Sequence, residues 1–300
     1  MKAFFEKCRG GGIAFQGWEL VIMRAAFSWL LWRSLPTDIP YGHQPVPNGL
    51  GSLLDLTFLA DTGLFAYLRI IYGGALVLFT AGWVPFISLG YAAVLITMAG
   101  GLENSQGAIG HHLQLVCMVA LSQWAAYLSL LRRGEVVWLP PSHESHQRAT
   151  NWAILVIVAS YVTSACVKLI ASGGLWVIQL PDISLQLIKT HANVYYDTLI
   201  PQSGWIATQL PHFIAAHPNL TRLFFAPGLL LELFAFLALF GRRQAMLFGL
   251  GLLSMHLLVR WVMNLSFGAH EWLLVIYLVN VPYFAWLGIK RLLVAHAEPQ

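Results

Sequence analysis

A lysine interrupts an otherwise apolar stretch of this sequence. Residues 160–176 read SYVTSACVKLIASGGLW, and Lys168 stands before the apolar character ends. A charged side chain at the centre of a membrane segment costs about 2.5–3.5 kcal/mol on insertion scales, so it needs a reason to be there. Two explanations stay open. The ammonium reaches the headgroups, or it faces an apolar cavity, where lost hydration makes the amine a usable base near neutral pH.

Other ionisable residues also lie within apolar segments and need partners. They are Glu19, Arg24, Arg69, Glu232 and Arg260. Glu19 and Arg24 share one predicted helix, and we expect each to pair with the other or with a neighbouring helix. Glu232 is expected to be the counter-ion of Arg69 or Arg260.

Three histidines add hydrogen-bonding groups to these charges. His256 and Arg260 are four residues apart and project from one helix face, which suits a quinone or anion contact or a buried structural pair. His111 and His112 point about 100° apart on a helix, so they do not form a metal site by themselves. One of them can donate a hydrogen bond into a cavity, or cap its helix. The three cysteines are widely spaced, and no metal cofactor is expected.

The elements that must position these residues are membrane helices. Of 300 residues, 58% are apolar and 10% are charged, whereas soluble chains have about 25% charged residues. Apolar segments recur that can each cross roughly 30 Å of hydrocarbon. We predict an all-α polytopic membrane bundle, one domain over residues 1–300, with eight transmembrane helices. Their predicted ranges are 13–33, 64–82, 84–101, 111–131, 150–171, 222–240, 244–264 and 268–289.

The distribution of basic residues predicts the orientation of this bundle. If the eight helices alternate across the membrane, ten Lys and Arg residues face one side and three face the other. The positive-inside rule then places both termini in the cytoplasm. The long connections 34–63 and 172–221 lie outside. The first is rich in Pro and Gly, and the second is expected to form short amphipathic helices on the outer leaflet. Basic residues spread over short loops do not indicate a nucleic-acid partner.

Three segments in order resemble the vitamin K-dependent gamma-carboxylase family and its bacterial HTTM-domain relatives. YVTSACVKLIASGGLW resembles the family signature through Tyr161, Lys168 and Trp176. GHHLQL is similar to an earlier histidine segment of the family, with His112 the closer match. SMHLLVRWVMNLSFG resembles a later segment through His256. The resemblance covers roughly residues 13–290.

The resemblance implies a membrane enzyme of lyase or oxidoreductase type that depends on a reduced, vitamin K-like lipid quinone. Lys168 would be the base that deprotonates the quinone, and His112 a second catalytic residue. The residues in contact with the quinone would be His111, Tyr161, Trp176, His256 and Arg260. The family's large luminal region has no counterpart after the last predicted helix, so gamma-glutamyl carboxylation of a protein is not expected.

A second hypothesis is that the chain has the same membrane fold but no catalytic activity. The chain would then be an accessory or scaffold subunit that positions a membrane or periplasmic partner protein, and its polar residues would only hold helices together. A transporter is less favoured, because no pair of broken apolar segments is apparent. Under either hypothesis we expect an integral membrane protein in contact with lipids, in a bacterial inner membrane.

Overall fold

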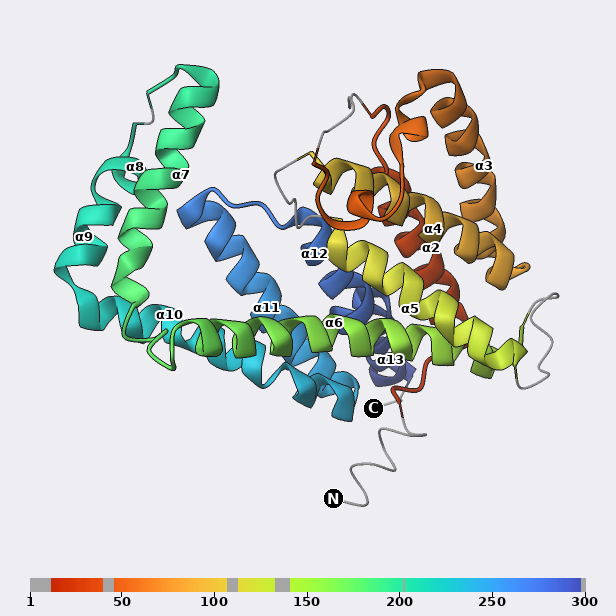
Figure 1. Ribbon diagram of the computed structural model, residues 1–300. Helices are drawn as coiled ribbons and strands as arrows, with labels where there is room; N and C mark the ends of the chain where they lie inside the picture. Colours follow the sequence, from red (N-terminus) through yellow and green to blue (C-terminus); the bar gives the residue numbers. More distant parts are fainter. Residues whose placement is uncertain (1–11, 40–45, 107–112, 133–140, 202, 298–300) are drawn as a thin grey trace. The chain divides into compact units, whose positions relative to one another are not determined.

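The computed structural model describes residues 12–39, 46–106, 113–132, 141–201 and 203–297. Every regular element within these ranges is helical (Figure 1). Six of the described helical segments are long and apolar enough to cross a membrane. The predicted all-α membrane fold is therefore confirmed, and the chain is an integral membrane protein.

The chain divides into two compact units. Unit 1 comprises residues 1–157 and 272–300, and unit 2 comprises residues 158–271. One long helix, α6 (His143–Ala171), contributes its first half to unit 1 and its second half to unit 2. A short helix, α12 (Gly268–Leu273), likewise crosses the second boundary.

Unit 1 is a bundle of long apolar helices. They are α2 (Gly17–Ser34), α3 (Thr62–Ala81), α4 (Pro85–Asn104) and α5 (Gln114–Leu131), followed after unit 2 by a π-helical segment (Leu274–Val279) and α13 (Val281–Ala297). The α4 helix packs against both α3 and α5. It approaches α5 closely at Gly90, where an added Cβ would lie 2.6 Å from Trp124 Nε1. Small residues permit such close helix contacts in membranes.

Unit 2 combines the end of α6 with shorter helices. These are the 3₁₀ turn Leu180–Asp182, α7 (Ile183–Thr198), α8 (Trp205–Thr208), α9 (Leu210–Ala216), α10 (Pro218–Leu233), the 3₁₀ segment Ala235–Phe240 and α11 (Arg242–Met263). A small core of Leu187, Ile214 and Val262 joins α7, α9 and α11. The helices expected in the 172–221 connection are confirmed, and their place on the outer leaflet stays a prediction.

Several predicted helix boundaries were wrong. The α6 helix begins at His143, so part of the expected 132–149 loop is helical. The predicted helix 222–240 is α10 followed by a separate 3₁₀ segment, with Pro227 inside α10. The predicted helix 268–289 is interrupted at Asn280, which has a left-handed φ of 47°.

Six of the eight predicted membrane segments meet the requirements of length and apolarity. Of the other two, α2 carries three charged residues in its 18, namely Glu19, Arg24 and Arg33. The second, 222–240, is divided between two shorter elements. The connection 34–63, expected not to be one continuous helix, holds the 3₁₀ turns Gly49–Ser52 and Thr57–Ala60.

Candidate functional site

Lys168 forms an ion pair within unit 2. Its Nζ donates to Glu232 Oε2 at 2.5 Å, and the two side chains are 34% and 6% exposed. Lys168 lies in the last turn of α6, and Glu232 lies near the end of α10. The prediction that Glu232 balances Arg69 or Arg260 was wrong, because the carboxylate faces the lysine instead. Sequence alone could not pair two residues 64 positions apart.

Trp176 also contacts Lys168. Its ring centroid lies 5.5 Å from Nζ, within the range of a cation–π contact. The SGG motif explains how the chain returns to the lysine. Gly173 and Gly174 have φ values of 59° and 84°, and the Gly174 N–H donates to the Leu169 carbonyl at 2.8 Å. Glycines in this conformation end a helix at low cost, so the indole is brought back over the last turn.

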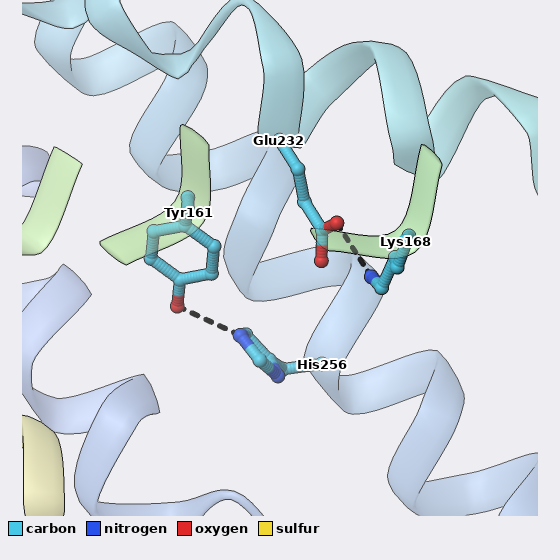
Figure 2. A network of polar contacts seen from close by, with 4 residues as sticks. All are labelled: Tyr161, Lys168, Glu232 and His256. Carbon is cyan, nitrogen blue, oxygen red and sulfur yellow. Dashed lines mark hydrogen bonds and ion pairs between the residues drawn. The ribbon is translucent and has the colours of Figure 1, made fainter. Parts of the chain in front are cut away.

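A second polar pair joins α6 to α11. The Tyr161 hydroxyl and His256 Nε2 are 2.7 Å apart, and both residues are buried. Tyr161 precedes Lys168 by seven residues, two helical turns, so both side chains project from the same side of α6. Figure 2 shows the tyrosine–histidine pair beside the lysine–glutamate pair. The structure therefore brings together four of the residues predicted for the site, Tyr161, Lys168, Trp176 and His256.

The cluster extends along α11 to the start of α12. Arg260, one turn after His256, forms an ion pair with Glu271 Oε2. The side chain of Glu271 is 10% exposed. The rings of Phe267 and His256 lie 5.0 Å apart between centroids. The sequence analysis missed Glu271. The signal was a carboxylate in the first turn of the predicted helix 268–289, directly after the predicted membrane helix that carries Arg260.

Two buried polar atoms of this cluster have no hydrogen-bond partner among the described residues. They are His256 Nδ1 and Glu271 Oε1. Leaving such an atom unsatisfied costs about 1–3 kcal/mol, so it usually indicates a water or ligand. In a neutral imidazole only one of the two ring nitrogens carries a proton, so the hydrogen bond at Nε2 of His256 determines the role of Nδ1. If Tyr161 donates to Nε2, then Nδ1 carries the proton and can donate to a ligand oxygen.

Two predicted site residues fall outside this description. His111 and His112 lie outside the described residues. Arg69, considered as a partner for Glu232, instead lies over the Trp32 ring of unit 1, with Cζ 4.7 Å from its centroid.

The cavities defined by residues such as Asp38 and Leu113, or Leu53 and Gln106, belong to unit 1 and do not include Lys168. No group of three or more His, Cys, Asp or Glu residues within the described ranges can hold a metal ion.

The fold and this cluster define a class of protein: a helical integral membrane protein with ionisable residues gathered among its helices. Comparison with protein-family models, with curated proteins and with solved structures found no match.

Proposed function

We propose that the chain is a membrane enzyme that removes a proton from a lipid-soluble substrate at the Lys168–Glu232 pair. The proposal rests on one observation: this ion pair lies beside the Tyr161–His256 hydrogen bond, and the two pairs come from three helices, α6, α10 and α11. Ionisable residues within membrane segments are costly and usually mark a functional site.

The ion pair determines how such a base would work. A lysine held as an ammonium has no lone pair with which to accept a proton. Transfer of a proton from Nζ to the Glu232 carboxylate, across 2.5 Å, would leave a neutral amine beside a protonated carboxyl. That amine can then take up the proton of a substrate hydroxyl. Charge is conserved, since the new ammonium balances the negative charge left on the substrate oxygen.

The residues fit a reduced lipid quinone, the substrate that the family resemblance implies. A reduced quinone supplies a weakly acidic hydroxyl group on an apolar ring. Trp176 and Phe267 provide aromatic surface next to Lys168 and His256, respectively. The buried Nδ1 of His256, which lacks a partner among the described residues, would hold a quinone oxygen by donating a hydrogen bond.

The proposed orientation places this chemistry on the outer side of the membrane. Lys168 lies in the last turn of α6, which runs outward if the N-terminus is cytoplasmic. The positive-inside distribution supports that orientation. A lysine and a histidine at this depth would meet a substrate that enters from the outer leaflet, in a bacterial inner membrane.

Mass spectrometry of organic extracts tests the proposal. We would purify the full chain in mild detergent as wild type, Lys168→Met and Lys189→Met. Lys189 is an exposed lysine on α7 of the same unit and serves as the matched control. We expect about one quinone per protein in the wild type and the control, and a loss of tenfold or more in Lys168→Met. The melting temperature of each variant separates lost binding from lost folding.

A second candidate function is favoured by the pairing of both site cations. Lys168 and Arg260 each have a carboxylate partner, as expected if the cluster only holds helices together in an accessory subunit. That function predicts no quinone in any variant and a partner protein that copurifies with wild type and Lys168→Met alike. Quinone bound to the wild type and lost from Lys168→Met would contradict it.

A further inference from the structure

Unit 1 buries a guanidinium that no carboxylate of the described residues balances. Arg24 lies on α2 and is 8% exposed. Its Nε donates to the Thr80 carbonyl at 3.3 Å. Within the described part of the chain, its two terminal amino groups make no hydrogen bond and it forms no ion pair. A buried charge normally requires an opposite charge and several hydrogen bonds, so Arg24 has capacity for a ligand.

His146 is held beside this guanidinium. The Tyr127 hydroxyl lies 2.8 Å from His146 Nδ1, and both residues are buried. This hydrogen bond fixes the orientation of the imidazole and leaves Nε2 available for another partner. Tyr127 lies near the end of α5, and His146 lies in the first turn of α6.

Gly82 shows where the two free groups converge. A Cβ added to this glycine would lie 3.2 Å from His146 Nε2 and 3.3 Å from Arg24 Nη2. Both nitrogens therefore approach one point next to the backbone. Gly82 ends α3 with a φ of 78°, a conformation that glycine adopts without strain. The absence of a side chain here lets the imidazole and the guanidinium come together against the backbone, so that both can donate to one ligand beside Gly82.

The position of this cluster suggests the nature of the ligand. Gly82, Tyr127 and His146 lie near the ends of three predicted membrane helices, namely after the end of α3, near the end of α5 and in the first turn of α6. Trp83, which follows Gly82, is 59% exposed, and exposed tryptophans are enriched at the membrane–water interface. Phosphate groups are the abundant anions at that depth. The planar guanidinium matches their geometry by donating two parallel hydrogen bonds.

We propose that Arg24 and His146 bind a phosphate group at Gly82, with Tyr127 as the residue that positions His146. The phosphate belongs either to a membrane lipid or to a soluble phosphate compound. This site lies wholly in unit 1 and shares no residue with the cluster around Lys168. The phosphate site can therefore be tested independently of the proposed proton chemistry.

Binding measurements on the full chain test the site and identify the source of the phosphate. The protein would be delipidated in detergent and titrated with dihexanoyl phosphatidylglycerol and, separately, with inorganic phosphate, with native mass spectrometry as the readout. We expect saturable binding of one molecule of at least one probe. Binding of the lipid alone assigns a lipid phosphate, and equal binding of both assigns the phosphate group by itself.

Three variants separate the site from general effects of charge. Arg24→Gln removes a charge-assisted contact and should weaken binding about 10- to 100-fold. His146→Gln should weaken it about tenfold, and this second variant keeps the test valid if Arg24→Gln fails to fold. Arg132→Gln changes an exposed arginine at the end of α5 and should leave affinity within about twofold. Wild-type affinity in a folded Arg24→Gln or His146→Gln protein, or no saturable binding of either probe to the wild type, would overturn the proposal.

Discussion

The two units handle buried charge differently. In unit 2, Lys168 faces Glu232 and Arg260 faces Glu271, so each cation of the cluster has its own carboxylate. In unit 1, the guanidinium of Arg24 has a backbone carbonyl as its hydrogen-bonding partner and a histidine as its neighbour. The first arrangement is electrically neutral within the chain. The second is positive among the described residues, and we propose that an anion from outside completes it.

This difference indicates what each cluster is suited to do. A neutral pair in a poorly hydrated place can pass a proton between its members without creating net charge, which suits acid–base chemistry. An unbalanced cation attracts a ligand of opposite sign, which suits binding. The same difference determines how each unit should respond to substitution.

The largest effect is expected where one member of the neutral pair is removed. Glu232→Leu leaves the Lys168 ammonium without its carboxylate. Removal of one partner from a buried pair costs 3–5 kcal/mol, and partial exposure of the lysine should reduce this to about 3 kcal/mol. The free energy of unfolding in mild detergent, measured by SDS titration, checks this value.

A double substitution sharpens the result. Lys168→Met combined with Glu232→Leu removes both charges and replaces them with apolar groups of similar length. Such replacements are often neutral or stabilising, so we expect the double variant to recover most of the stability lost in Glu232→Leu. A double variant as unstable as Glu232→Leu would show that the glutamate is needed for reasons other than the lysine.

A smaller loss is expected at Gly82 in unit 1. Gly82→Ala forces a Cβ into a left-handed conformation, which costs about 1–2 kcal/mol, and places it against His146 and Arg24. Gly74→Ala is the matched control, since it lies in the same helix and its added Cβ meets open space. The control should be neutral or stabilise the protein by up to about 1 kcal/mol. Thermal unfolding of the two variants compares them directly, and equal melting temperatures would contradict the strain at Gly82.

The sequence predicted more of the unit 2 cluster than of the unit 1 cluster. The resemblance grouped Tyr161, Lys168 and His256, and the structure brings these residues to one place. Glu232 was assigned the wrong partner, because its contact depends on where α10 stops and the 3₁₀ segment begins. Local sequence carries little information about that break, whereas apolar length and charge predicted most of the helices.

The unit 1 cluster was missed for a different reason. Residues 132–149 were expected to be a loop, so His146 was not placed on a helix or near Arg24. The early start of α6 at His143 depends on a polar sequence, HESHQR, that has no apolar periodicity. Such a segment becomes helical as the extension of a membrane helix, and composition alone does not predict this.

A further loss of about 1 kcal/mol is expected from Tyr161→Phe in unit 2. The ring remains, but His256 Nε2 loses its 2.7 Å hydrogen bond and stays buried. Tyr127→Phe is the corresponding change in unit 1, where the hydroxyl bonds to His146. If only the unit 2 pair serves the proposed chemistry, Tyr161→Phe should weaken quinone retention and Tyr127→Phe should not. Equal retention in both variants would count against a role for Tyr161 in the site.

The smallest effect tests whether Trp176 contributes to the neutral cluster beyond its apolar surface. Trp176→Leu removes the ring that faces Lys168 Nζ at 5.5 Å. A partly exposed cation–π contact is worth about 0.5–1 kcal/mol. Trp261→Leu in the same unit changes a tryptophan that is 68% exposed and should alter stability by less than about 0.5 kcal/mol.

Repeating both substitutions in a Lys168→Met background isolates the interaction between the indole and the ammonium. Because the ammonium is then absent, the cost of Trp176→Leu should fall to that of the control. An unchanged cost would mean that the indole stabilises unit 2 by packing alone, and that Glu232 is the sole partner of the lysine charge.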